Sequence, residues 1–204
     1  MPGNLGFHGH CLSTTTEDRA RGEPLPEFAA MLRAKYTDAQ TSFVEAALLE
    51  ESVQDVKFYV STSPSSSSLF RPTRQIMDAL AMNIRVQDTI TVRGTTLAEL
   101  CQELGLQSID VLKLDVQGAE LRVLQGSGDY LRAIKHLILE VSFWPEYETA
   151  PLFCTVREWL TGNGFVLRNL FGRSATVTRG LISGRRLLLQ PAFVIRVCYQ
   201  LHIL

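Results

Sequence analysis

The sequence has few cysteines and almost no net charge. Its four cysteines lie far apart and form no C-x-x-C pair. This pattern argues against a zinc ribbon or a disulfide scaffold and is typical of a reducing compartment, so we expect a cytoplasmic protein. The formal net charge is −1. A balance so close to zero gives no electrostatic reason to expect nucleic acid or an anionic membrane as a partner.

Long uninterrupted apolar runs are also missing. The tail RRLLLQPAFVIRVCYQLHIL (185–204) is apolar, but arginines, a glutamine and a proline interrupt it. A membrane helix needs about 20 mostly apolar residues in a row. We therefore interpret the tail as terminal strands and expect no membrane partner. The start of the chain has no basic stretch followed by an apolar one, so we expect no secretory signal.

Several catalytic and binding motifs are absent as well. The sequence has no G-x-S-x-G nucleophile elbow and no G-x-x-x-x-G-K-[ST] phosphate loop. It also has no G-x-G-x-x-G turn to hold a dinucleotide pyrophosphate. HGHC (8–11) offers three ligand atoms for a metal, with no fourth ligand nearby. We interpret that segment as part of a disordered tail and expect no metal site.

The sequence predicts a single domain in which strands and helices alternate. At 204 residues and 46% hydrophobic residues, the chain can bury one sizeable core. The clearest helix is predicted over 95–105, where Thr96 and Glu99 form a capping box and Gly105 ends the helix. Other helices are predicted over 27–36, 118–125, 129–135 and 152–161, and strands over 41–48, 56–61, 109–115, 136–142 and 165–170.

The strands that alternate with helices are nearly continuous apolar runs, which indicates an α/β fold with a parallel sheet. In particular, we expect strands 109–115 and 136–142 to pair in parallel. Ligands bind beyond the carboxyl ends of the strands in such sheets. The acidic residues expected at or near strand ends are Glu23, Glu45, Asp115 and Glu140.

Asp115 is the most informative of these acids, because a glycine (Gly118) and a second acid (Glu120) follow it. A carboxylate at a strand end can face the ligand crevice, and the glycine lets the chain turn closely into the next helix. Asp115 could equally cap helix 118–125, and the two roles are compatible. Glu120 lies in the first helical turn, where the helix dipole favours an acid. Lys113 and Glu140 are weaker candidates for site residues.

Five segments, in the same order along the chain, resemble the FkbM-type methyltransferases, which use S-adenosylmethionine. They are GEPLPEFAAMLRAKY (22–36), VEAALLEESVQDVKFYVSTSPSSSSL (44–69), SIDVLKLDVQGAELRVLQGSGDYL (108–131), IKHLILEVSFWPEY (134–147) and VREWLTGNGF (156–165). The resemblance is clearest over residues 23–168. It implies a Rossmann-like class I methyltransferase sheet, mostly parallel, with S-adenosylmethionine as cofactor and a small molecule or glycan as methyl acceptor.

The resemblance also implies roles for individual residues. Glu23 would bind the ribose hydroxyls of the cofactor, and Glu45 and Ala46 would border its adenine. Asp115 would lie beside the methionine end and the acceptor, where a carboxylate can orient a hydroxyl or take its proton. At the position of Gln117 the family usually has glutamate, so a charge is lost beside Asp115.

The largest departure from the family is at the start. The family's first strand ends in an aspartate and a glycine-rich turn, and nothing in residues 1–22 matches it. We therefore expect 1–22 to be an unstructured or unrelated lead-in with no strand before Glu23, and 23–204 to form the methyltransferase domain. The sheet would be incomplete and the chain truncated. Such a fold would be marginal, with exposed apolar surface along strand 109–115.

Three functions remain open from the sequence. The first is an active S-adenosylmethionine-dependent methyltransferase acting on a hydroxyl of a small molecule or sugar. The second is a non-catalytic remnant of such an enzyme, suggested by the missing glycine-rich turn. The third is an NAD-type oxidoreductase, which is the weakest because the sequence has no G-x-G-x-x-G.

Overall fold

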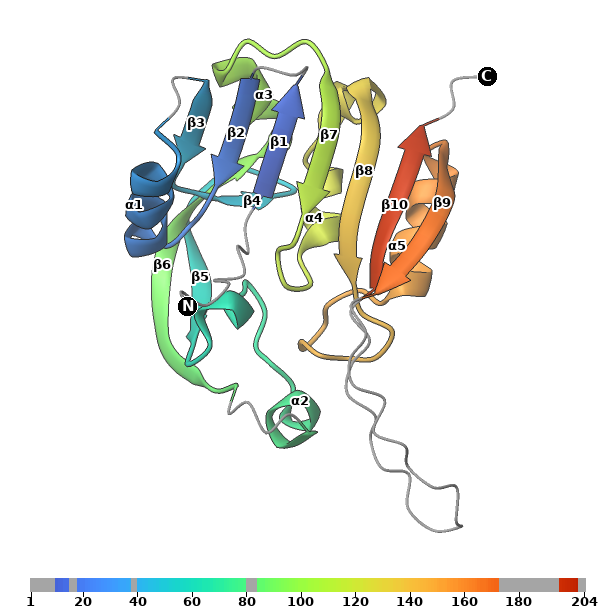
Figure 1. The fold of residues 1–204 in the computed structure, drawn as a ribbon. Coiled ribbons are helices and arrows are strands. Elements are labelled where there is room, and N and C mark those ends of the chain that lie inside the picture. Colours follow the sequence, from blue (N-terminus) through green and yellow to red (C-terminus); the bar gives the residue numbers. More distant parts are fainter. Residues whose placement is uncertain (1–9, 15–17, 38–39, 80–83, 173–194, 202–204) are drawn as a thin grey trace, which may run out of the picture.

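A seven-stranded sheet forms the centre of the molecule (Figure 1). The computed structural model describes residues 10–14, 18–37, 40–79, 84–172 and 195–201. The strand order is β3-β2-β1-β7-β8-β10-β9. The strands are β1 (His10–Thr14), β2 (Asp18–Gly22), β3 (Thr41–Val44), β7 (Ile109–Leu114), β8 (Ile134–Val141), β9 (Phe165–Gly172) and β10 (Ile195–Leu201).

The sheet is mixed rather than uniformly parallel. Strands β7 and β8 pair in parallel, which confirms the prediction for 109–115 and 136–142. Strands β2 and β3 are the other parallel neighbours in this sheet. Strands β1 and β10 run opposite to the other five, as Figure 1 shows. The predicted α/β class is therefore confirmed, whereas the expectation of a mostly parallel sheet holds for strand direction but not for neighbouring pairs.

The prediction that no strand precedes Glu23 is wrong, because β1 and β2 both lie there. Strand β1 lies in the interior of the sheet, paired antiparallel with β2 on one side and with the middle strand, β7, on the other. His10 and Cys11 of the HGHC segment are in β1 rather than in a disordered tail, while residues 8 and 9 lie outside the described residues. A five-residue strand without alternation is not visible in local sequence, since its pairing with β7 depends on a distant segment. A domain boundary at residue 23 stays a prediction.

The expected exposure of strand 109–115 is also wrong. Ile109, Leu112 and Leu114 are fully buried, each with 0% exposed surface. They belong to the main hydrophobic core, together with residues of β8 and of the helices that follow β6, β7 and β8. With β1 on one edge and β8 on the other, β7 has backbone partners on both sides. The position beside β7 that we expected to be vacant is therefore filled by β1.

A second, three-stranded sheet has the order β4-β6-β5. Its strands are β4 (Ala47–Leu49), β5 (Val53–Ser61) and β6 (Val86–Thr96). The predicted strand 41–48 is two strands, β3 and β4, because the chain passes from one sheet to the other at residues 45–46. Between β5 and β6 lie the short helices η1 (Pro64–Ser66) and α2 (Arg74–Ala79). Figure 1 shows that this part of the chain extends past the carboxyl ends of the parallel strands.

The predicted helices are present with small shifts of their ends. They are α1 (Pro26–Lys35), α3 (Leu97–Glu103), α4 (Glu120–Gln125), the 3-10 helix η2 (Gly128–Ala133) and α5 (Phe153–Gly162). The Thr96 side chain accepts a hydrogen bond from the Glu99 amide, and Gly105 has a φ of +65°, so both ends of α3 are as predicted. Among the described residues, no helix is long and apolar enough to cross a membrane.

Candidate active site

The register of the strands brings four acidic residues to one edge of the seven-stranded sheet. Gly22 pairs with Val44, and Leu114 pairs with Leu139. One residue further along each strand stand Glu23, Glu45, Asp115 and Glu140. Because β2, β3, β7 and β8 all run in the same direction, these residues lie at the carboxyl edge, where sheets of this kind bind ligands.

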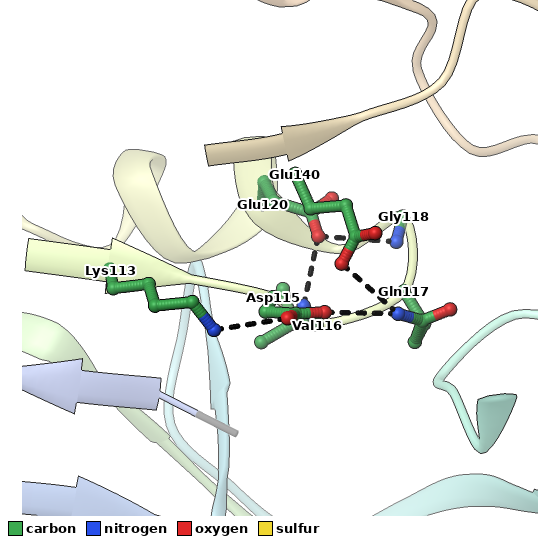
Figure 2. Close-up of polar contacts among 7 residues, drawn as sticks. All are labelled: Lys113, Asp115, Val116, Gln117, Gly118, Glu120 and Glu140. Atoms are coloured by element: carbon green, nitrogen blue, oxygen red, sulfur yellow. Dashed lines mark hydrogen bonds and ion pairs between the residues drawn. The ribbon is translucent and has the colours of Figure 1, made fainter. Parts of the chain in front are cut away.

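Asp115 is held from two sides at the end of β7 (Figure 2). Its side chain is buried, with 2% of its surface exposed. The Lys113 ammonium lies 3.0 Å from Oδ2, and Nε2 of Gln117 donates to Oδ1 over 3.1 Å. An ammonium and an amide N–H therefore supply partners for both oxygens of this carboxylate, which offsets the cost of burying its charge.

Glu140 lies next to Asp115 on the neighbouring strand, β8. Nε2 of Gln117 is 3.5 Å from Oε2 of Glu140, so one amide nitrogen faces both acids. Burial is the main cause that raises the pKa of Glu140 well above its usual range, followed by a hydrogen bond with Asp115 and the negative charge of Asp115. Lys113 opposes this shift. Burial and the neighbouring charge of Asp115 therefore favour the protonated form of Glu140.

Glu120 closes the turn that follows Asp115. Its Oε1 accepts the backbone N–H of Val116 over 2.9 Å and that of Gly118 over 3.4 Å. The turn needs left-handed backbone at two successive residues, with φ of +54° at Gln117 and +97° at Gly118. A side chain at residue 118 would bring its Cβ within 2.9 Å of the Ala150 Cβ. The glycine is therefore required both by its backbone conformation and by the space available.

Glu23 and Glu45 follow neighbouring strands on the other side of β1. Glu23 is buried, and its Oε1 accepts the Leu25 backbone N–H over 3.1 Å. Glu45 is exposed and forms an ion pair with Arg33 of α1, whereas Ala46 is almost fully buried. Strand β1 separates β2 from β7, so a strand spacing of about 4.8 Å puts Glu23 about 10 Å from Asp115 along the edge. The cofactor-binding roles of Glu23, Glu45, Ala46 and Asp115, and the catalytic role of Asp115, stay predictions.

Two residues of this site were missed in the sequence, Tyr147 and Ser68. The buried Tyr147 hydroxyl lies 2.8 Å from Oε1 of Gln117 and 3.1 Å from the Ser66 carbonyl. Ser68 donates its hydroxyl hydrogen to the Gln117 carbonyl over 2.7 Å. Burial is the main cause that raises the pKa of the Tyr147 phenol above its usual value, so it stays a neutral donor. These contacts join segments far apart in the chain, and no local pattern predicts them.

The residues at this edge fit S-adenosylmethionine in part. Buried carboxylates suit ribose hydroxyls, as at Glu23, and suit a positive sulfonium, as at Asp115. The glycine-rich turn that the resemblance implies for the methionine part of the cofactor does not follow β1 at this edge. Strand β1 runs toward the opposite edge and ends there at Thr14. The chain leaving β1 therefore cannot supply a glycine-rich turn at the carboxyl edge. Within the described residues, no group of three or more histidine, cysteine or acidic side chains could hold a metal ion.

Comparison with known proteins identifies the family of the chain. The methyltransferase FkbM domain family matches residues 21–167. A curated relative, the 2-O-methyltransferase NoeI of Sinorhizobium fredii (strain NBRC 101917 / NGR234), is 37% identical over 65 residues. That match covers 32% of this chain and 27% of the relative. No solved structure matches. Since the family match covers most of the chain, including all four strand-end acids, the chain belongs to the FkbM methyltransferase family.

Proposed function

We propose that this chain is an S-adenosylmethionine-dependent methyltransferase that methylates a hydroxyl oxygen of a small molecule or sugar on a Rossmann-like sheet. One observation carries the proposal: a buried carboxylate, Asp115, is held by Lys113 and Gln117 at the carboxyl edge of the sheet. Membership of a methyltransferase family supports the reaction class. The printed name of the relative, a 2-O-methyltransferase, supports oxygen as the atom that receives the methyl group.

For methyl transfer the protein would mainly have to align the methyl donor with the acceptor and place a negative charge near the sulfonium. S-adenosylmethionine supplies an activated methyl group on a sulfonium. The new O–C bond forms as the S–C bond breaks, and the hydroxyl proton of the acceptor must leave. In this proposal Asp115 would orient that hydroxyl or take its proton, and its charge would stabilise a sulfonium bound beside it. Glu23 would bind the ribose hydroxyls, and Glu45 and Ala46 would border the adenine.

The test is methyl transfer by the variant Asp115→Asn. Asparagine keeps an acceptor for the Gln117 amide but removes the charge, so the fold should persist while turnover falls about 10²- to 10⁴-fold. The assay follows a labelled methyl group from S-adenosylmethionine into a panel of sugars and polyols. The matched control is Asp110→Asn, at the other end of β7, where the aspartate pairs with Lys135. That variant should transfer methyl groups like the parent chain.

A non-catalytic remnant is the second candidate, and the direction of β1 favours it. The last residue of β1 lies at the opposite edge, so the turn that follows this strand does not face the carboxyl edge. On this alternative the parent chain transfers no methyl group to any acceptor, and it releases no calorimetric heat with S-adenosylmethionine. Both results together would contradict the proposed methyltransferase activity.

A further inference from the structure

We propose that Gln117 is a positioning residue that holds Asp115 and Glu140 side by side, and that Tyr147 fixes the direction of its amide. The inference rests on the proposed function, because it assigns Asp115 the task of orienting or deprotonating the acceptor. It goes beyond that function in naming how the pair of acids is kept in place. Figure 2 shows the Gln117 side chain reaching toward both carboxyl groups.

The first argument is the position of the amide nitrogen. Nε2 lies 3.1 Å from Oδ1 of Asp115 and 3.5 Å from Oε2 of Glu140. A primary amide has two hydrogens on its nitrogen, so it can donate to two acceptors at once. The amide therefore ties the end of β7 to the end of β8 through their side chains, in addition to the backbone pairing of Leu114 with Leu139.

The second argument is that a group on the oxygen side of the Gln117 amide, the Tyr147 hydroxyl, orients it. An amide turned by 180° would point its oxygen at both acids and lose the donor. Tyr147 favours the observed direction, since its hydroxyl lies 2.8 Å from Oε1 of Gln117 and can donate to that oxygen. The Tyr147 hydroxyl also lies 3.1 Å from the Ser66 carbonyl oxygen. Its single hydrogen is therefore shared between that carbonyl and Oε1 of Gln117. With its raised pKa, Tyr147 remains protonated and does not add a further negative charge beside Asp115.

The third argument is the backbone of Gln117. A residue other than glycine at a φ of +54° lies in the left-handed region, which is uncommon for such residues and persists when the surroundings hold it there. Here the hydroxyl of Ser68 binds the Gln117 carbonyl over 2.7 Å, and the same hydroxyl accepts the Phe70 amide over 3.0 Å. The conformation is thus imposed by the segment between β5 and β6, and it directs the side chain at the two acids.

The fourth argument is the local charge. The charged or titratable groups that face Asp115 include Lys113 from β7, Glu120 from α4 and Glu140 from β8. Only one of the three is a cation. A residue that donates a hydrogen without carrying charge is what lets two acids approach, and an amide meets that need whereas a carboxylate would oppose it.

The first experiment measures the titration of Asp115 and Glu140 by carbon-13 NMR of their carboxyl groups, assigned with Asp115→Asn and Glu140→Gln. Gln117→Met has nearly the same shape without the amide, so the titration midpoint of Asp115 should rise by about one pH unit. Gln117→Glu adds a like charge and should raise it further. Tyr147→Phe frees the amide to turn and should raise the midpoint by a smaller amount in the same direction.

The matched control is Tyr130→Phe. Tyr130 lies in η2, which precedes β8, so it is at the opposite edge of the sheet. This variant makes the same chemical change and should leave the Asp115 midpoint where it is in the parent chain. Tyr147→Phe keeps the buried ring, so it remains informative if either Gln117 variant fails to fold.

The second readout is steady-state kinetics. If Gln117 and Tyr147 position the acids, Tyr147→Phe should lower kcat about ten- to a hundredfold while KM for S-adenosylmethionine stays unchanged. Unchanged carboxyl titrations in both Gln117→Met and Tyr147→Phe would overturn the positioning role, whether or not the parent is active. Absence of both methyl transfer and S-adenosylmethionine binding by the parent would instead contradict the proposed function, and it is distinguishable because the NMR titration needs no turnover.

Discussion

At the scale of single residues, three neighbouring acids differ in task because they differ in contacts. Asp115 has an ammonium and an amide N–H as partners and keeps its charge. Burial and the neighbouring charge of Asp115 raise the pKa of Glu140, which favours its protonated form. Glu120 stabilises the backbone of the turn, because one of its oxygens accepts hydrogen bonds from two backbone N–H groups. Environment therefore separates the roles of residues of the same chemical kind.

Glu120 gives a pH-dependent prediction. Burial is the main cause that raises its pKa from the usual 4.5 to about 7. The folded chain then holds a proton that the unfolded chain releases, so the stability from this group is fully present below pH 4.5 and is lost as the pH rises through 7. Glu120→Gln keeps the acceptor oxygen and removes the titration. We expect the free energy of unfolding of the parent, relative to that variant, to fall by about 1.4 kcal/mol per pH unit across this window.

The measurement is urea denaturation of both proteins at a series of pH values spanning that window. Asp115 and Glu140 are present in both proteins, so their own titrations largely cancel in the difference. Two stability curves that run parallel from acidic to neutral pH would show that Glu120 titrates normally in the folded state.

At the scale of elements, the end of α4 packs directly on β4. A Cβ at Gly126 would lie 2.0 Å from the Leu49 carbonyl oxygen, although the glycine's φ of −78° suits any residue. The obstacle at Gly126 is therefore steric. Gly126→Ala should push α4 and β4 apart and cost about 1–3 kcal/mol of unfolding free energy, as overpacking does.

Gly162, the last residue of α5, is the matched control, because a Cβ there would meet nothing within 4 Å. Gly162→Ala should be neutral or stabilise the fold by up to about 1 kcal/mol, since it restricts the unfolded chain. Thermal unfolding of the two variants beside the parent checks this. Equal Tm values for both variants would contradict the close approach of α4 to β4.

Sequence alone predicts elements whose signals are local. The cap at Thr96, the αL glycine at Gly105 and the apolar run of β7 each act within a few residues, and all three appear in the structure. The split of 41–48 into β3 and β4 was not predicted, since it depends on which distant strand each half pairs with. The same holds for Tyr147, whose partners at Ser66 and Gln117 are 81 and 30 residues away in the chain.

At the scale of the whole molecule, an interior strand of reversed direction completes the sheet. Strand β1 gives β2 and β7 a backbone partner on their facing sides, although β1 itself starts, rather than ends, at the carboxyl edge. The acids that follow β2, β3, β7 and β8 keep their places along that edge. Among the described residues, β7 is therefore paired on both sides, and the candidate ligand edge consists of the acidic side chains that follow the parallel strands.

The central claim is that this edge binds S-adenosylmethionine through Glu23, and calorimetric titration tests it most directly. The proteins are the parent chain, Glu23→Ala and the control Glu27→Ala, which removes an exposed acid from the first turn of α1. We predict binding by the parent and by Glu27→Ala with the same affinity. Loss of a hydrogen-bonded carboxylate costs about 1.5–3 kcal/mol, so Glu23→Ala should bind about ten- to more than a hundredfold more weakly. No heat from the parent at millimolar S-adenosylmethionine, or equal affinity of the parent and Glu23→Ala, would contradict the claim.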